Sequence, residues 1–326
     1  MRVIQVTRFG GPEVLVPAAA PDPVAGAGQL VIAAAASDVL FLDTLIRAGR
    51  AAGFFPHRPP YVPGNGVGGQ VISVGSGVDS GWLGQQVIAH TGGPGGAGGY
   101  AGQAVADVQD VVAVPGNLAV TDAVAVLHDG PTALRIAEIA DVQPGQRVLI
   151  LGAAGGMGIL LIQLLRARGA RVTGAARGRA KLRAVAQAGA AAVDYSHPRW
   201  TAEVLEATEG ARPDVVLDGA GGQLGHAAYE ITADGGRFSA HGSPSGSFTA
   251  IDAEDARQRN ITIITLRDLG TGPGQRAGLT RRILAELSSA RIHPLIGQTF
   301  PLAEAAKAHS AIEVRDAIGK TLLLAG

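Results

Sequence analysis

The sequence predicts an α/β protein of two domains, in which a mostly β domain precedes a doubly wound parallel sheet. A chain of 326 residues with 47% hydrophobic residues is long enough for two hydrophobic cores. Short strand-like runs separated by glycine fill residues 1–121. From residue 122 onward, strand-like runs alternate with stretches of helical periodicity, which is the pattern of a parallel sheet with crossover helices.

Composition excludes several classes of function. Lys plus Arg and Asp plus Glu both number 27, so the sequence indicates no basic surface for a nucleic acid or an anionic membrane. The absence of cysteine excludes disulfides, thiolate nucleophiles and cysteine-ligated metal centres. No apolar run approaches the roughly 18 residues of a membrane span, and the first residues do not resemble a signal peptide. We therefore expect a cytoplasmic protein that binds neither nucleic acid nor membrane.

In the first domain, strands are expected at residues 3–6, 29–35, 69–74, 86–89 and 111–114. One short helix is expected over residues 39–48, where Leu42, Leu45 and Ile46 recur at helical spacing. The glycine cluster at 92–99 cannot pack a core. We expect a flexible connector there, with a lid as the alternative.

In the second domain, strands are expected at residues 147–151, 171–175, 215–218, 237–241 and 261–265, and helices at 157–168, 180–188 and 224–232. The tail should hold helices at 279–290 and 302–314 and a last strand at 320–325. Because residues 321–324 (TLLL) suit a sheet better than a terminal helix, the tail is expected to return to the first domain. The predicted domains are therefore 1–121, completed by 267–326, and 122–266.

The most informative segment is residues 147–168, an apolar strand followed by a glycine-rich turn and an amphipathic helix. Gly152, Gly155 and Gly158 form G-x-x-G-x-x-G, whereas the usual dinucleotide fingerprint has glycine where Ala153 stands. Glycine lets the backbone approach a pyrophosphate, and the helix directs its free N–H groups at that anion. The segment predicts a nucleotide site; the alternative is a glycine-rich turn without a ligand.

The end of the second strand predicts which nicotinamide cofactor binds. No acidic residue occurs between residues 170 and 192, although an NAD site generally uses one to accept hydrogen bonds from the ribose hydroxyls. Basic residues cluster there instead, namely Arg177, Arg179, Lys181 and Arg183. They favour NADPH, because they can neutralise its 2′-phosphate. Not all four can converge on one phosphate, so some must form a solvated basic face.

These residues carry a resemblance that covers nearly the whole chain. Its landmarks are residues 10–15 (GGPEVL), 41–49 (FLDTLIRAG), 63–78 (PGNGVGGQVISVGSGV), 127–134 (LHDGPTAL), 152–158 (GAAGGMG), 192–195 (AVDY), 215–222 (VVLDGAGG) and 318–324 (IGKTLLL). The chain resembles a medium-chain dehydrogenase/reductase, specifically the zinc-independent quinone oxidoreductase (zeta-crystallin-like) branch. The resemblance implies a GroES-like β domain, completed by the tail, beside a Rossmann domain, with cofactor and substrate between them.

The resemblance also implies which residues bind the cofactor. The pyrophosphate would lie on Gly152, Ala154, Gly155, Gly156, Met157 and Gly158. Lys181 matches the family lysine at the 2′-phosphate and Tyr195 matches the tyrosine at the adenosine end, whereas the role of Arg177 depends on its charge alone. The nicotinamide half would be lined by Thr132, Gly219, His241, Gly242 and Ser243, and Lys320 matches a family lysine before the last strand.

The zinc chemistry of a related branch is not expected here. The positions at which that branch holds its catalytic metal correspond to Leu40, Asn65 and Gly66, none of which binds zinc well. Without a Lewis acid, hydride must go to an acceptor that is already activated by conjugation. A quinone or an α,β-unsaturated carbonyl meets this requirement, because it delocalises the incoming charge.

The substrate side departs from the family pattern. Leu40 and Leu45 replace a family asparagine and tyrosine, which makes the pocket more apolar and puts small-quinone reduction in doubt; with Asn65 and His128 they are the predicted substrate-binding residues. His128, Asp43 and His241 are the catalytic candidates. An imidazole at His128 could protonate an enolate or hydroquinone oxygen, although a hydrogen-bonded structural histidine is the alternative. Asp43 has the alternative role of fixing its helix and Arg47.

The leading hypothesis is an NADPH-dependent oxidoreductase that reduces a quinone or an activated enone. The rivals are an enoyl reductase that tailors a bulky secondary metabolite, a catalytically silent NADPH-binding protein, and an α/β domain without a cofactor. The resemblance implies a homodimer. The apolar residues 261–266 (ITIITL) could pair with a second copy, or form an internal strand with no such role.

Overall fold

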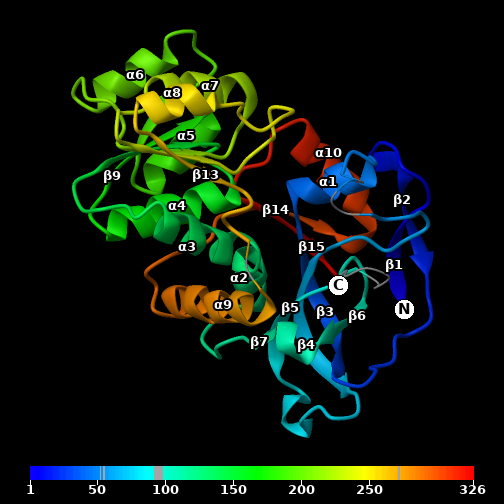
Figure 1. Cartoon of the computed structure of the whole chain (residues 1–326). Coiled ribbons are helices and arrows are strands. Elements are labelled where there is room, and N and C mark those ends of the chain that lie inside the picture. The colour runs from blue at the N-terminus through cyan, green and yellow to red at the C-terminus, as the bar shows by residue number, and fades with distance from the viewer. Residues whose placement is uncertain (52, 54–55, 92–97, 271) are drawn as a thin grey trace. The chain divides into compact units, whose positions relative to one another are not determined.

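The structure is a computed structural model that describes residues 1–51, 53, 56–91, 98–270 and 272–326. Its contacts divide the chain into two compact units (Figure 1). The first consists of Met1–His128, Gly272–Ser289 and Pro294–Gly326, and the second of Asp129–Thr271 and Ala290–His293. Most of the connector or lid expected at 92–99 lies outside the described residues.

A mostly antiparallel sheet organises the first unit. It runs in the order β14, β15, β3, β4, β5, β7, and β6 also pairs with β3. The strands are β3 (Gln29–Val39), β4 (Gly66–Val74), β5 (Gln86–His90), β6 (Gln103–Asp107), β7 (Val111–Ala113), β14 (Ile296–Pro301) and β15 (Lys320–Leu324). A separate hairpin of β1 (Arg2–Val6) and β2 (Leu15–Ala19) shares a buried apolar cluster with Leu302 and Leu323 of the tail.

The tail completes this sheet. β15 pairs antiparallel with β3, so that Thr321 lies opposite Val39 and Leu324 lies opposite Ala36. Leu322 and Leu323 are fully buried, because β15 lies between β14 and β3 inside the sheet. The last strand of the chain is therefore a central strand of a sheet that the first third of the chain begins.

The helices of the first unit are α1 (Phe41–Arg47), α2 (Val120–Val126), α9 (Pro273–Ser288) and α10 (Ala305–Glu313), with 3-10 turns η1 (Pro12–Val14), η2 (Ser80–Trp82), η3 (Val108–Asp110) and η4 (Leu302–Glu304). α2 packs on β3, β4 and β5 and buries Ala123, Val124, Ala125 and Val126. Its contacts place it in the first unit, whereas the sequence-based boundary at residue 121/122 cuts through this helix. The later limit at residue 271 likewise differs from the expected 266.

The second unit is a parallel sheet in the order β10, β9, β8, β11, β12, β13. Its strands are β8 (Arg147–Leu151), β9 (Arg171–Ala176), β10 (Ala191–Asp194), β11 (Val215–Asp218), β12 (Arg237–Ala240) and β13 (Thr262–Thr265). The helices are α3 (Asp129–Ile139), α4 (Gly156–Ala167), α5 (Arg179–Gln187), α6 (Trp200–Ala207), α7 (Gly222–Glu230) and α8 (Ala253–Gln258). This strand order is doubly wound and reverses between β8 and β11, where such sheets bind ligands. The predicted fold class is therefore confirmed.

Two of the elements that sequence reasoning missed, α2 and β10, lack a strong pattern of their own. α2 (VTDAVAV) is rich in β-branched valine and does not look helical, yet its apolar side chains are covered by three strands. β10 (AAVD) is short and buries only Val193 fully. Tertiary packing, rather than local preference, determines both elements. β2, β6, β14, α3, α6 and α8 were also not expected.

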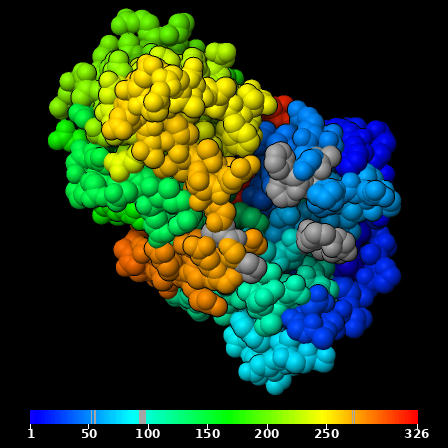
Figure 2. All heavy atoms as spheres, in the orientation of Figure 1, coloured from blue at the N-terminus to red at the C-terminus, as the bar shows by residue number. Residues whose placement is uncertain are grey.

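The segment considered for dimerisation forms an edge strand. β13 pairs with β12 and, among the described residues, with no other strand. Near it in sequence, α8 lies on the surface with only Ala256 buried, and its atoms are visible on the face shown in Figure 2. An open strand edge is compatible with pairing between two copies. The homodimer itself stays a prediction.

No helix in the described part of the chain is both long enough and apolar enough to cross a membrane.

The central position of β15 makes its apolar side chains essential for stability. We expect Leu322→Ala to lower the free energy of unfolding by about 2–5 kcal/mol, because Leu322 is 0% exposed and its loss leaves a cavity. Val314→Ala, at a side chain 65% exposed in the same tail, should change it by less than about 0.5 kcal/mol. Urea denaturation followed by circular dichroism measures both. Equal effects of the two substitutions would contradict the central placement of β15.

Candidate functional site

The predicted phosphate-binding turn connects β8 to α4 in the second unit. Gly152 has φ +67°, a left-handed conformation that favours glycine. A Cβ on Gly158 would lie only 2.6 Å from the carbonyl oxygen of Ala153, so the helix packs on the turn without room for a side chain. No side chain caps the start of α4 at Gly155, which leaves its first N–H groups available to an anion. The predicted pyrophosphate residues Gly152, Ala154, Gly155, Gly156, Met157 and Gly158 all lie here.

Two further strands end beside this turn. A Cβ on Gly219, after β11, would lie 2.7 Å from the carbonyl oxygen of Leu151, and one on Gly242, after β12, would lie 2.2 Å from the carbonyl group of Gly219. The structure thus brings these predicted residues together at the carboxyl ends of β8, β11 and β12. His241 is buried between them, with its Nδ1 3.1 Å from the hydroxyl of Ser239. Burial lowers the pKa of His241 to about 4, so near neutral pH it is an uncharged hydrogen-bonding group.

Asp218 holds the loop after β11 in place. Its Oδ1 accepts hydrogen bonds from the backbone N–H groups of Ala220 at 2.9 Å and Gly221 at 2.8 Å, and the hydroxyl of Thr249 donates to Oδ2. Burial nevertheless raises the pKa of Asp218. This carboxylate orders the loop that contains Gly219. The other predicted nicotinamide residues of this unit are both half-buried, Thr132 in α3 and Ser243 after β12, and their roles stay predictions.

The carboxyl end of β9 has the basic character that the sequence indicated. Arg177 is exposed just after the strand, and Lys181 is half-buried in α5, which has no acidic residue in its first turn. Sequence reasoning missed Asp194, at the end of the neighbouring β10. Its carboxylate accepts hydrogen bonds from Gly178 N at 3.1 Å and from Ser196 N at 2.9 Å, and therefore fixes the turn that carries Arg177. Tyr195 follows, half-buried and packed against the apolar core.

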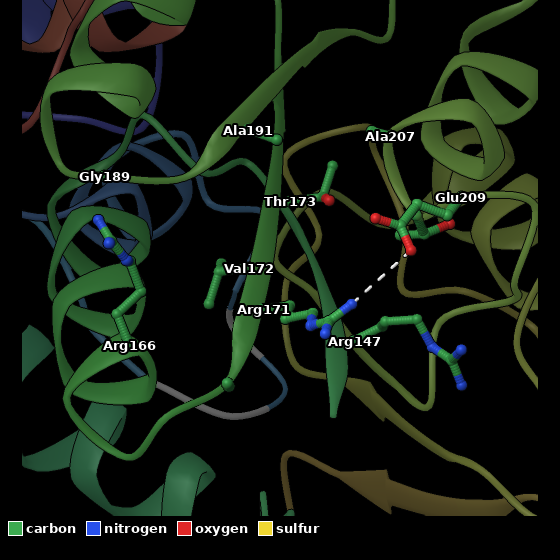
Figure 3. Close-up of a pocket in the computed structure, with 11 residues that line it drawn as sticks. Arg147, Arg166, Arg171, Val172, Thr173, Gly189, Ala191, Ala207 and Glu209 are labelled. Carbon is green, nitrogen blue, oxygen red and sulfur yellow. Dashed lines mark ion pairs between the residues drawn. The ribbon is translucent and has the colours of Figure 1, made fainter. Parts of the chain in front are cut away.

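A pocket of about 340 Å³ lies at the opposite end of this sheet (Figure 3). Arg147 and Arg171 begin β8 and β9, so the pocket is at the amino ends of the strands, away from the glycine-rich turn. Its charges are largely paired: Arg147 donates to Asp214 at 2.7 and 3.0 Å, and Arg171 lies 3.9 Å from Glu209. This pocket is not part of the candidate nucleotide site.

In the first unit, Asp43 is the centre of one buried polar cluster. The carboxylate accepts hydrogen bonds from Leu40 N at 2.8 Å, Asn65 Nδ2 at 2.7 Å and the Tyr100 hydroxyl at 3.2 Å. The Tyr100 oxygen is in turn 3.1 Å from Nε2 of His309. Burial raises the pKa of Asp43 to about 6. The structure therefore brings the predicted residues Leu40, Asp43 and Asn65 together.

The alternative role that we considered for Asp43 is only half supported. Its bond to the Leu40 backbone caps α1, as a helix-fixing role requires. Arg47, however, forms its ion pair with Glu313 of α10. Leu45, on the same helix, is half-buried.

A second buried cluster surrounds Asp38 and contains two other predicted residues. The Oδ2 atom of Asp38 is 2.9 Å from Nζ of Lys320 and 2.9 Å from Nδ1 of His128. His128 Nε2 is 3.2 Å from Nδ1 of His90. Lys320, assigned by resemblance to the cofactor, is 4% exposed and serves here as the partner of Asp38. Its contact with a cofactor stays a prediction.

The three positions that hold zinc in the related branch do not fit a metal ion. Leu40 has no donor atom, and the amide of Asn65 is bonded to Asp43. Gly66 has no side chain, and a Cβ there would lie 2.7 Å from Oδ1 of Asp38. No other group of three or more metal-ligating side chains is formed by the described residues.

Sequence reasoning missed Asp38, His90, Tyr100 and His309 in this unit. None belongs to a local motif, and each acquires its partner from a distant segment: Asp38 from residue 128, and Tyr100 from residues 43 and 309. The only available signal was chemical, since a charged residue inside an apolar strand such as β3 requires a partner.

Comparison with known proteins agrees with this geometry. Residues 26–116 match the family model of the alcohol dehydrogenase GroES-like domain, and residues 156–272 match that of zinc-binding dehydrogenase. A probable quinone oxidoreductase of Schizosaccharomyces pombe is 31% identical over 99% of this chain and 96% of its own length. A 2-haloacrylate reductase of a Burkholderia species is 30% identical over 98% of this chain and 97% of its own. The mycobacterial protein Rv1454c, solved in complex with NADPH, is 28% identical and superposes with a TM-score of 0.88, covering 99% of this chain and 100% of that one.

A GroES-like unit together with a doubly wound unit defines a medium-chain dehydrogenase/reductase. Within that superfamily the chain belongs to the quinone oxidoreductase branch. The family expectation that we drew from the landmark residues is thereby confirmed.

The raised pKa of Asp43 predicts an unusual dependence of stability on pH. Because the folded state binds this proton more tightly than the unfolded state, whose pKa is near 3.8, the contribution of Asp43 to stability declines as the pH rises from about 4 to about 6. The decline is at most about 3 kcal/mol. We expect Asp43→Asn to remove it, as measured by urea denaturation from pH 4 to pH 8.

Asp316→Asn removes an exposed carboxylate from the same unit and is the control for the loss of one charge. If Asp43→Asn and wild type keep the same difference in stability across this range, the protonation assigned to Asp43 is wrong.

Proposed function

We propose that this chain is an NADPH-dependent oxidoreductase that transfers hydride to a quinone or to an activated α,β-unsaturated carbonyl. The observation that carries the proposal is the turn between β8 and α4, where Gly152 and Gly158 leave backbone N–H groups open at a helix N-terminus. The family supports the reaction class. The NADPH in the Rv1454c complex supports the cofactor.

The residues present fit NADPH. In the proposal, the glycine-rich turn receives the pyrophosphate, and Arg177 and Lys181 receive the 2′-phosphate at the end of β9. The carboxylate of Asp194, at the end of the neighbouring β10, is bonded to the backbone of Gly178 and Ser196 and so holds the turn that carries Arg177. His241 and the loop ordered by Asp218 would position the nicotinamide. When bound, the reduced nicotinamide supplies the hydride, so the protein contributes orientation and electrostatics.

Side chains of the first unit support a particular class of acceptor. Leu40 and Leu45 are half-buried and offer no polar group to orient a small quinone. The amide of Asn65 already donates to Asp43, so an acceptor would have to compete with that hydrogen bond. These side chains favour a bulkier or more apolar acceptor, which keeps an enoyl reductase of a large metabolite as the second candidate. The 2-haloacrylate reductase among the relatives supports activated alkenes as a class of acceptor.

A titration with NADPH and separately with NADH tests this proposal. Nicotinamide fluorescence should show NADPH binding at least about tenfold more tightly than NADH, because the basic end of β9 complements a 2′-phosphate. Addition of 9,10-phenanthrenequinone or cyclohex-2-enone to the complex should then consume the NADPH. Tight binding without consumption would favour the catalytically silent alternative, and no binding would contradict the assignment of the turn.

The discrimination between the two cofactors should depend on Lys181. We expect Lys181→Ala to weaken NADPH binding by about tenfold to 100-fold, since a charge-assisted hydrogen bond contributes about 1.5–3 kcal/mol, and to leave NADH binding nearly unchanged. Arg171→Ala is the matched control, because Arg171 lies on the same sheet but at the amino end of β9. Equal weakening of NADPH binding by both variants would show that overall charge, rather than a phosphate site, determines the preference.

A further inference from the structure

Four neighbouring strands meet at one end of the sheet in the first unit, and three of them bring an ionisable side chain there. Lys320 begins β15, Asp38 lies near the end of β3, Gly66 begins β4 and His90 ends β5. Because adjacent strands here are antiparallel, the start of one lies beside the end of the next, and His90 is directly opposite Gly66. α2 packs on the same strands and is followed by His128, which completes the group.

These side chains form a continuous array. Lys320 and His128 both contact Oδ2 of Asp38, and His128 Nε2 lies 3.2 Å from His90 Nδ1 with the two rings perpendicular. Both ring nitrogens of His128 are therefore occupied. The Nε2 atom of His90 is buried and has no hydrogen-bond partner among the residues that the structure describes. His90, rather than His128, has the open nitrogen at the end of the array.

Gly66 makes this array possible. A Cβ at Gly66 would lie 2.6 Å from Cδ2 of Leu127, 2.7 Å from Asp38 Oδ1 and 2.7 Å from Cε1 of His128. A side chain at this position would therefore crowd the imidazole in its place between Asp38 and His90.

We propose that Asp38, His128 and His90 form a proton relay for the reduction, and that the proton leaves the relay from Nε2 of His90. This inference depends on the proposed function, because hydride transfer to a quinone or an enone leaves an anion whose oxygen must take up one proton. Lys320 keeps Asp38 ionised, and Asp38 keeps a proton on Nδ1 of His128.

The relay has two states, each with every internal hydrogen bond made. In the charged state, His128 donates from Nδ1 to Asp38 and from Nε2 to Nδ1 of His90, and His90 carries its own proton on Nε2. When the Nε2 proton of His90 passes to the product oxygen, Nδ1 of His90 takes the Nε2 proton of His128. Both rings are then neutral, and His90 donates to His128 instead. One proton has left. After the product departs, Nε2 of His90 takes up a proton and the shared proton returns from Nδ1 of His90 to Nε2 of His128, which restores the charged state.

The electrostatic surroundings agree with a relay in which His90 transmits the proton without storing it. Burial and the neighbouring His128 lower the pKa of His90 to about 3, with Arg276 of α9 acting in the same direction and Asp38 of β3 opposing it. Burial alone would raise the pKa of Asp38, but His128 and Lys320 hold it far below its usual value. Asp43 of α1 is the other carboxylate coupled to this cluster.

His90→Asn tests the relay, because asparagine places an amide near the Nδ1 position but cannot pass a proton. With 9,10-phenanthrenequinone as acceptor, we expect kcat to fall about 100-fold, NADPH affinity to stay within about twofold of wild type, and added imidazole to restore part of the activity. His128→Asn should behave in the same way. His226→Asn, at an exposed histidine of α7, is the control for the removal of one imidazole.

The solvent isotope effect separates proton transfer from a structural role. In mixtures of H2O and D2O, the wild-type rate should fall along a curve with the fraction of D2O, because two protons move in the same step. The rate of the His90→Asn variant should not show this curvature. A His90→Asn variant that keeps the wild-type kcat and isotope effect overturns the relay. If His90→Asn does not fold, Gly66→Ala is the second variant, because its methyl group crowds His128. We expect it to lower kcat and added imidazole to restore part of the activity.

A readout without turnover distinguishes failure of the relay from failure of the proposed function. Nitrogen-15 spectra of histidine-labelled wild type should show His128 protonated at Nδ1, with an Nε2 resonance that shifts in the His90→Asn variant. Absence of that shift overturns the relay even if NADPH is consumed. If the shift is present but NADPH is consumed with neither the quinone nor cyclohex-2-enone, the proposed function fails, and the relay fails with it as a catalytic device.

Discussion

The burial of the Asp38 carboxylate is the constraint on which the first unit depends. A buried charge without a partner costs several kcal/mol, so Asp38 requires the compensation that Lys320 and His128 supply. Lys320 belongs to the last strand of the chain, and His128 lies at the limit between the two units. The pairing of β15 with β3 therefore completes the sheet and also brings Lys320 to the buried charge of Asp38. The same contacts hold the tail, β3 and the cluster around Asp38 together.

The two units contribute different parts of the proposed chemistry. The second unit supplies positions where backbone must come close to backbone, at Gly158, Gly219 and Gly242, and these are the conditions that a dinucleotide needs. The first unit supplies buried ionisable groups, which are the conditions that proton handling needs. Asp43, whose pKa burial raises, and Asp38, whose pKa its partners lower, differ although both are buried. Cationic partners, and not burial, separate the two carboxyl groups.

Sequence reasoning found secondary structure correctly where the signal was local. The strand, turn and helix over residues 147–168 were predicted because every part of that motif is contiguous, and the nucleotide site assigned to them stays a prediction. His128, Lys320 and Asp43 were each identified as candidates, but not their partners. That Lys320 and His128 share Asp38, and that His90 adjoins His128, follows from strand register between segments far apart in the chain, which no local pattern reveals. α2 was missed for a related reason, since packing determines its helical form.

The central claim is that the chain catalyses hydride transfer from NADPH, and single-turnover kinetics with labelled cofactor test it most directly. Protein preloaded with NADPH that carries deuterium on either face of C4 would be mixed with 9,10-phenanthrenequinone or cyclohex-2-enone, and the absorbance of the reduced nicotinamide followed. The account predicts that the absorbance disappears with at least one acceptor and that deuterium on one face alone slows its loss. Bound NADPH that keeps its absorbance with both acceptors, or a loss that neither label slows, would contradict it.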